Sequence, residues 1–594
     1  MRRQQSGRVP ALAVLAAFLA APMAFGAGGP SKVEETVSDL AFVATSQEVP
    51  VEGVGLVMNL DGTGSDPAPD IHRKKLVDEM RKARVDRPDL WLANGQTSLV
   101  LVRTKIPPGI GPADGLDVEV VLPPGSKTTS LAGGWLIQAR LTEVGIDKQG
   151  NEREGRYLAW AMGPVMTGTK DKPDDLKSGR ILGGGHVKKE IPYLLLIKPQ
   201  HQSGRTAALL EAIVRKRFNQ HQGHERVGMA TAKSDKHLEL RVPRVYHQNQ
   251  SRYFQVVRLL PVAETPDLDA ERRKRWGKEL LDPKTAGVAA LKLEGLGTET
   301  IPELKAALTS PDAQVRFFAA EALAYLGDES CVPELARTAV EREEFRAYAL
   351  SALATVDEPV ATIQLRKLMD QPDPKVRYGA FNALRRQDPT DGFLGRVRLA
   401  EDEPEPQADN PMAMPLPPVR SRNRAPDPFA LYIVDSDGPP MVHVSRARRP
   451  EIVVFGRGQR LATPLVLGGS GTFLINADLG DEQLQLSRIG TGGAGRGDRK
   501  VAVPPDLGEV IRQLARLDAT YPEIVALLTQ AQRQANLPGP LIVDATPLPD
   551  PKYTEAQLAG KDAGKKDDAV QRAKADAPQG RRGLIGRLRG RLGR

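Results

Sequence analysis

Few residues of this chain stand in a spacing that supports catalysis. His221 and His224 lie in a polar stretch beside Glu225, but two histidines without a third ligand or an HExxH helix do not make a zinc site. The chain has no GxSxG turn to present a serine nucleophile, and Cys331 is its single cysteine. Paired carboxylates for glycoside cleavage are recognised by their separation in space, so a polysaccharide-processing enzyme stays open as a weak alternative. We therefore predict no catalytic residue, no metal and no cofactor.

A glycine-rich turn is the next segment that could do chemistry. It follows an apolar strand at residues 53–60 and contains Asp61, Gly62, Thr63 and Gly64. Glycine permits positive φ angles, and Asp and Thr side chains can hydrogen-bond to the backbone of a turn. The segment lacks the Lys–Ser/Thr pair of a P-loop and the GxGxxG spacing that opens a helix, which argues against nucleotide binding. A structural turn is the expected role.

Strand-like runs dominate the first 265 residues. Runs of β-branched residues bounded by Gly, Pro and Asp predict strands, and apolar residues at helical spacing predict one amphipathic helix at residues 206–218. The alternation in residues 237–262 predicts further strands, before charged residues mark a boundary at 265–280. The expected strands are residues 53–60, 97–106, 116–122, 134–141 and 193–197.

Two nearly identical segments then reveal a helical repeat. Residues 312–323 read DAQVRFFAAEAL, residues 373–384 read DPKVRYGAFNAL, and a weaker copy around Arg346 lies between them. A period of about 30 residues is typical of stacked helix pairs. Residues 280–395 resemble HEAT repeats, and the resemblance implies a scaffold or docking surface. Cys331 falls where one of these helices begins, so a buried thiol is expected there.

The repeats also predict how their helices begin. Asp312 and Asp373 stand at N-cap positions, where a carboxylate accepts hydrogen bonds from free backbone N–H groups. Arg316 and Arg377 follow their aspartates by four residues, within side-chain reach along a helix. We therefore predict capping by the aspartates and pairing within each helix.

The two ends of the 594-residue chain carry distinct signals. Arg2 and Arg3 precede the apolar run 11–21 and small residues near Gly26, which predicts a signal peptide over residues 1–26 and an exported protein. The formal net charge is +9, and six arginines without an acid follow residue 580. Such a tail predicts contact with a polyanion, an envelope polymer or anionic lipid, while a solvated tail is the alternative. These arginines are Arg581, Arg582, Arg587, Arg589, Arg591 and Arg594.

The region between the repeats and the tail contains two further segments. Residues 396–427 are rich in Pro and charge and are expected to be a disordered linker. Residues 428–550 predict strands near 429–434, 451–455 and 471–475, followed by two short amphipathic helices and a final strand. Residues 551–594 form the predicted basic, disordered tail.

Several stretches in order resemble the family of the bacterial flagellar P-ring protein. The first, GVGLVMNLDGTG, carries Gly53, Gly55, Asp61, Gly62, Thr63 and Gly64. The others lie at residues 102–118, 129–136, 179–192, 194–218 and 241–262, with a further one at 506–543. Residues 121–127 and 429–490 depart from the pattern, and the cysteines that some relatives pair are absent. The resemblance covers residues 35–265, and 500–545 more weakly, and the predicted P-ring-like N-terminal region is residues 27–265. The expected fold is therefore α+β: a β-rich P-ring-like body split by an inserted helical solenoid.

The resemblance implies an exported structural subunit and no catalysis. Such a subunit assembles with itself into a periplasmic ring around the flagellar rod, in contact with peptidoglycan and adjoining the L-ring. A closed ring needs a head-to-tail interface. The solenoid is expected to add an outward docking surface for a protein, and no nucleic-acid partner is expected. An envelope-associated scaffold or interaction protein that reuses this fold without a flagellar role is the alternative.

Overall fold

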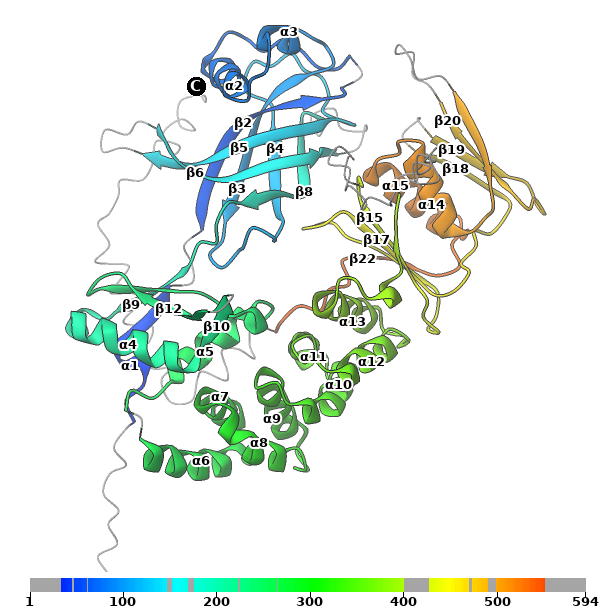
Figure 1. Cartoon of the computed structure of the whole chain (residues 1–594). Helices are drawn as coiled ribbons and strands as arrows, with labels where there is room; N and C mark the ends of the chain where they lie inside the picture. Colours follow the sequence, from blue (N-terminus) through cyan, green and yellow to red (C-terminus); the bar gives the residue numbers. More distant parts are fainter. Residues whose placement is uncertain are drawn as a thin grey trace, which may run out of the picture. The chain divides into compact units, whose positions relative to one another are not determined.

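The computed structural model describes residues 34–550 except for residues 45–47, 61, 147–151, 169–175, 223–224, 264, 400–426, 470–472 and 490–497. The predicted signal peptide, most of the predicted linker and the arginine-rich tail therefore lie outside the described residues. The chain is mixed α+β, as predicted (Figure 1).

The first body of the chain is an antiparallel sheet that closes on itself. Its order is β4-β3-β2-β5-β6-β8-β7, and β4 also pairs with β8. Alternate valines and leucines of these strands fill the interior, and helices α2 and α3 cover an outer face at β2 and β3. The elements are β2 (Val49–Met58), α2 (Ile71–Lys82), α3 (Pro88–Leu92), β3 (Ser98–Ile106), β4 (Leu116–Val121), β5 (Trp135–Ile146), β6 (Glu152–Pro164), β7 (Met166–Thr167) and β8 (Ser178–Val187).

A second, four-stranded sheet follows, with the order β1-β9-β13-β12. Helices α4 and α5 pack on it (Figure 1). Its elements are α1 (Val37–Leu40), β1 (Ala41–Ala44), β9 (Tyr193–Ile197), α4 (Gly204–Arg217), the hairpin β10 (Asn219–Gln222) and β11 (Glu225–Gly228), β12 (Ala230–Ala232), β13 (His237–Leu240) and α5 (Gln250–Leu259).

Helix α5 corrects the prediction of strands throughout residues 237–262. Asn249 caps the helix by accepting a hydrogen bond from the backbone N–H of Arg252. Tyr253, Val256 and Val257 recur at helical spacing and are fully buried. Aromatic and β-branched residues favour strands in general, but here burial of one helical face outweighs that preference.

Eight helices form the solenoid of the described chain. It begins earlier than the predicted residue 280, because the charged segment that follows Thr265 is a helix. Thr265 caps this helix, α6, and Trp276 on it is buried. Helices α7, α9, α11 and α13 form an inner layer, and α6, α8, α10 and α12 an outer one (Figure 1). The bounds are α6 (Pro266–Leu280), α7 (Ala286–Leu296), α8 (Ile301–Ala307), α9 (Ala313–Tyr325), α10 (Val332–Glu341), α11 (Glu343–Leu353), α12 (Pro359–Leu368) and α13 (Pro374–Gln387).

The C-terminal module contains two sheets and two helices. One sheet has the order β14-β15-β17-β16-β22, with β22 parallel to β16, and the other runs β18-β19-β20-β21. The bounds are β14 (Arg396–Val397), β15 (Ala430–Val434), β16 (Met441–Val444), β17 (Glu451–Phe455), β18 (Leu465–Gly469), β19 (Phe473–Ala477), β20 (Leu484–Arg488), β21 (Arg499–Val503), α14 (Leu507–Arg516), α15 (Tyr521–Arg533) and β22 (Leu541–Val543). The two predicted helices and final strand are thus present.

The closed sheet and helices α14 and α15 have separate cores, contrary to the expectation that the solenoid merely interrupts a single body. Helices α14 and α15 bury their apolar faces against strands of the C-terminal module. Among the described residues, the first 265 contribute only Met166 to that core. A continuous core instead runs from the four-stranded sheet through the solenoid to β15 and β17. None of the described helices is long and apolar enough to cross a membrane.

Candidate functional site: a buried ion network at the junction

A group of charged side chains is buried where α5 meets the solenoid. Arg252 on α5 is 4% exposed, Glu294 on α7 is fully buried, and Glu321 on α9 is 1% exposed. Burial of three ionised groups is expensive unless they neutralise one another. Because these residues lie on three different helices, their contacts tie α5 to both α7 and α9.

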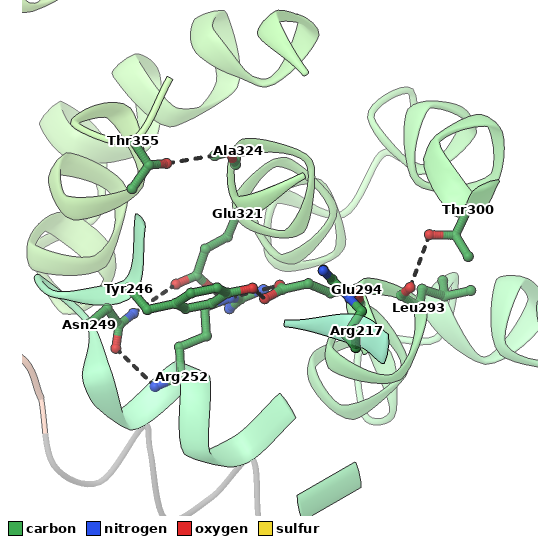
Figure 2. A network of polar contacts seen from close by, with 10 residues as sticks. All are labelled: Arg217, Tyr246, Asn249, Arg252, Leu293, Glu294, Thr300, Glu321, Ala324 and Thr355. Atoms are coloured by element: carbon green, nitrogen blue, oxygen red, sulfur yellow. Dashed lines mark hydrogen bonds and ion pairs between the residues drawn. The ribbon is translucent and has the colours of Figure 1, made fainter. Parts of the chain in front are cut away.

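Arg252 divides its donors between the two carboxylates (Figure 2). Its Nε and Nη2 lie 2.9 and 2.6 Å from Oε2 of Glu294, and its Nη1 lies 2.5 Å from Oε2 of Glu321. Tyr246 donates from its hydroxyl to Oε1 of Glu294 at 2.6 Å, and Arg217 donates from Nε to the Glu294 backbone carbonyl at 3.0 Å. Charge-assisted hydrogen bonds of this kind are stronger than neutral ones.

Aromatic rings cover the network. Tyr246 and Tyr325 stack with ring centroids 4.7 Å apart, and the Arg252 guanidinium lies 5.0 Å from the centroid of Tyr325. Burial raises the pKa of Glu321 to about 7, and the attraction of Arg252 offsets this only in part. Since Glu294 shares the same guanidinium, one cation serves two carboxylates. Burial lowers the pKa of Arg252, but the two carboxylates outweigh it and the net shift is upward.

The network is built to hold helices together and not to turn over a substrate. Its charged groups are enclosed by protein on all sides, with exposures of 0 to 4%. No three His, Cys, Asp or Glu side chains among the described residues form a group that could hold a metal ion. This arrangement holds α5 against α7 and α9 through directional polar contacts.

A second buried cluster joins the other end of the solenoid to the C-terminal module. Glu451 on β17 accepts hydrogen bonds from Tyr378 and Arg385 of α13. The ring of His443 stacks on Tyr378 with centroids 3.5 Å apart. Burial lowers the pKa of His443 to about 4, so this imidazole is neutral at physiological pH. The solenoid is thus fixed by polar contacts at both ends.

The predicted caps are confirmed, but the predicted pairs within each helix are wrong. Asp312 accepts from the backbone N–H groups of residues 314 and 315, and Asp373 from that of residue 375. Arg316, however, pairs with Glu334 of the next helix at 3.2 Å, and Arg346 of the preceding repeat pairs with Asp373 at 3.0 Å. Both arginines thus pair with a carboxylate of a neighbouring helix, and Arg316 does so in place of the aspartate four residues before it.

Arg377 has a different role from the one predicted. Only 1% of it is exposed, and its Nε donates to the Met369 carbonyl at 2.8 Å. Its other nitrogens donate to the Ser436 hydroxyl at 3.0 Å and to the Pro439 carbonyl. This side chain therefore holds the loop after β15 against the solenoid.

The glycine-rich turn is structural, as expected, and its glycines serve contacts within the chain. Gly62 has φ +81°, and Thr63 donates from Oγ1 to the carbonyls of Leu60 and Ser130 at 2.7 and 2.8 Å. A Cβ on Gly64 would lie 2.2 Å from the Thr97 carbonyl oxygen.

Two earlier glycines of the signature also mark close approaches. A Cβ on Gly53 would lie 2.0 Å from the Arg140 carbonyl oxygen, and one on Gly55 would lie 2.6 Å from Leu136. Both neighbours are on β5, so these glycines let β2 and β5 approach each other. The predicted Asp61 and tail arginines lie outside the described residues.

Sequence reasoning missed the ion network altogether. A signal existed, since Glu294 and Glu321 each interrupt an otherwise apolar helical face, in AALKLEGL and FFAAEAL. A carboxylate in such a position needs a partner. Cys331 agrees with its prediction: it is a buried free thiol whose pKa burial raises to about 12.

The fold and the network define a class of protein: a β-rich region followed by a helical repeat, with buried ion pairs between α5 and the first inner helices of the repeat. Comparison with known proteins narrows this class. A family model described as flagellar P-ring protein matches residues 36–270, and a PBS lyase HEAT-like repeat model matches residues 315–338. The predicted resemblance to both is confirmed over these residues.

Individual relatives agree with the family model. The flagellar P-ring protein of Thermotoga petrophila is 26% identical over 251 residues, which are 40% of this chain and 69% of the relative. That of Wolinella succinogenes is 26% identical over 280 residues, 45% of this chain and 70% of the relative. That of Nitrosospira multiformis is 30% identical over 166 residues, 27% of this chain and 42% of the relative. The predicted resemblance of residues 506–543 lies outside the family-model match and stays a prediction.

Proposed function

We propose that this chain is an exported structural subunit of a ring around the flagellar rod in the periplasm. The observation that carries the proposal is that the family match takes in whole sheets of the fold. The matched residues 36–270 comprise the closed sheet, the four-stranded sheet and α5. The match therefore covers two complete sheets, with glycines of its signature in close approaches within that region.

The ring is proposed to form by self-association of the matched region through a head-to-tail interface. Its partners are the rod, the L-ring and peptidoglycan, by analogy with the P-ring family. We assign no enzymatic role, by analogy with the P-ring family, whose role is structural.

The solenoid is proposed as an outward docking surface for a further protein. Its inner face is covered by segments of the chain itself, including α5. Its outer helices expose apolar side chains: Val340 on α10, and Val360 and Ile363 on α12, are 37, 40 and 51% exposed. Docking is therefore assigned to the outer helices.

Electron microscopy of the purified chain from residue 27 onward tests the ring. The proposal predicts closed particles of uniform diameter by negative stain and one high-mass species by mass photometry. A matched sample carrying Arg252→Met tests whether the joint at α5 is needed. A wild-type protein that stays monomeric at micromolar concentration, with native circular dichroism, would contradict the proposal.

The arginine-rich tail is proposed to bind anionic envelope polymer or lipid headgroups. Counterion release favours such binding and makes it salt-dependent. The test compares the full chain with one that ends at residue 550 in co-sedimentation with cell-wall sacculi and anionic vesicles. Equal binding by both chains would rule out the tail as the contact.

An envelope scaffold without a flagellar role is the second candidate. It is favoured by one observation: the relatives named above match at most 45% of this chain, so a flagellar role of the matched part does not account for the rest. A stable monomer that captures one soluble partner, with no ring, would favour this function over the first.

A further inference from the structure

The inner face of the solenoid is covered by two segments of the chain that are far apart in sequence. Helix α5 lies on α7 and α9 through the Arg252 network. Residues 545–550, here named the C-terminal arm, lie on α11 and α13 (Figure 1). The arm follows directly after β22 and ends where the described chain ends.

The arm is seated by specific contacts at both of its ends. The backbone N–H of Ala545, which is 5% exposed, donates to Nε2 of His443 at 3.1 Å. At the other end, the Tyr348 hydroxyl on α11 donates to the backbone carbonyl of Asp550 at 3.2 Å. The arm is thus held in an extended course between the β16 strand and the solenoid.

Gly379 on α13 makes room for the centre of the arm. A Cβ at this position would lie 2.9 Å from Cγ of Pro547 and 2.6 Å from Leu350. In the matching repeat segment, VRFFAAEAL against VRYGAFNAL, the position is occupied by Phe318, which is buried. A bulky residue in one repeat and glycine in the other produce a notch at α13 alone, and Pro547 occupies it.

The notch suits an extended segment with proline. Proline has no backbone N–H, so it can be packed against a helix surface without leaving a donor unsatisfied. Ser351, Asn382 and Arg386 line a cavity of about 40 Å³ beside Thr546 and Pro547. The next residue, Leu548, is 82% exposed and does not hold the arm. The groove between α11 and α13, here named the arm groove, therefore recognises a short stretch around one proline.

We propose that the arm groove is an exchangeable site and that its alternative occupant is the C-terminal arm of a second copy of this chain. Every copy carries both the groove and the arm, so a contact that forms within one copy can form between two with the same geometry. The six residues of the arm extend about 20 Å at most, which sets how near an adjoining copy must lie. In a dilute solution of monomers each groove holds the arm of its own chain, because the effective concentration of the tethered arm is in the millimolar range.

Exchange becomes competitive where copies are held side by side, since their local concentration is then similar. The arm would link neighbouring copies of any assembly that this chain forms. The proposal concerns two elements of the C-terminal half and does not depend on the ring.

Two variants of the full chain test the exchange by complementation. In the first, residues 546–550 are replaced by Ser-Gly-Ser-Gly-Ser, which leaves the groove empty. In the second, Gly379→Val fills the notch and leaves the arm free. Mixing the two is expected to give a one-to-one complex by mass photometry, whereas each alone shows no such species. Absence of the complex, with both variants folded by circular dichroism, overturns the proposal.

A peptide provides a second measurement that does not depend on the Gly379→Val chain. A labelled peptide of residues 544–551 is titrated into the arm-replaced chain and into wild type, with fluorescence anisotropy as the readout. Binding to the arm-replaced chain should be at least about tenfold tighter, because wild type holds its own arm. A peptide with Pro547→Asp should lose binding, and its matched control with Leu548→Ser should keep it. Equal binding to both chains, or equal binding of both peptides, overturns the proposal.

Discussion

Substitution of Arg252 by Met removes the one cation that two buried carboxylates share. Methionine is unbranched and uncharged but shorter, so the change keeps the packing of the side-chain stem and removes the guanidinium with its charge and hydrogen bonds. Glu294 and Glu321 are 0 and 1% exposed, and loss of the guanidinium leaves both without their positive partner. Breaking a buried ion pair in this way typically costs about 3 to 5 kcal/mol. We expect that loss at the junction between α5 and the solenoid.

Hydrogen exchange read by mass spectrometry reports the loss locally, on peptides that cover α5 and α9. Since about 1.4 kcal/mol corresponds to a factor of ten, exchange should accelerate by roughly two to four powers of ten at pH 8. The effect should be smaller at pH 5.5. The raised pKa of Glu321, about 7, means that this carboxyl is already protonated there and needs the cation less.

Arg244→Met is the matched control, because Arg244 lies in the same region and is exposed. It should leave exchange unchanged within about twofold, as most surface substitutions cost little. A chain that combines Arg252→Met with Glu294→Gln and Glu321→Gln should recover much of the protection, because no unpaired buried charge remains. The reasoning is refuted if Arg252→Met and the control behave alike at pH 8, or if the effect is larger at pH 5.5.

Four further substitutions or labels test other contacts. The free energy of unfolding should fall as pH rises from 5 to 8, by at most about 3 kcal/mol from Glu321, because a raised carboxyl pKa favours the protonated folded state. Glu321→Gln should reduce this dependence of the melting temperature on pH. An unchanged dependence in the variant would contradict the assignment. Gly64→Ala should destabilise more than Gly62→Ala in urea, because a Cβ at 64 meets a backbone oxygen at 2.2 Å whereas Gly62 has open space and a positive φ costing about 1 to 2 kcal/mol; the reverse order would be evidence against the turn geometry. Arg377→Leu should cost about 2 to 4 kcal/mol and speed proteolysis of the loop after β15, because buried carbonyls lose their donor; equal cleavage would exclude that role. Cys331 should resist iodoacetamide in the native protein and react in urea, since its pKa is about 12; native labelling would show that the thiol is accessible.

The sequence contained enough information for most strands and for the repeat, because both leave a periodic apolar pattern. The predicted strands at residues 97–106 and 116–122 are present as β3 and β4, and the caps Asp312 and Asp373 are in place. Helix α5 was predicted as strand because its buried side chains are aromatic or β-branched, as in many strands. The decisive feature, a cap at Asn249 followed by helical spacing, is local but weak.

The contacts that join the parts could not be read from the sequence. Arg252 and Glu294 are separated by 42 residues, and no pattern specifies that distance. The pairs expected for Arg316 and Arg377 followed local helix spacing, but Arg316 found Glu334 on the next helix instead. The arm depended on a single difference, Gly379 in place of the Phe318 of the matching repeat. Pairing between distant elements is decided by three-dimensional packing, which a single sequence does not display.

The proposed role of this chain as a ring subunit is tested most directly in the cell. Electron cryotomography and subtomogram averaging can compare flagellar basal bodies of the source bacterium with those of a strain lacking this chain. The account predicts that a ring of density around the rod in the periplasm is lost in the deletion strain and restored by the wild-type chain. An unchanged ring in the deletion strain would contradict it.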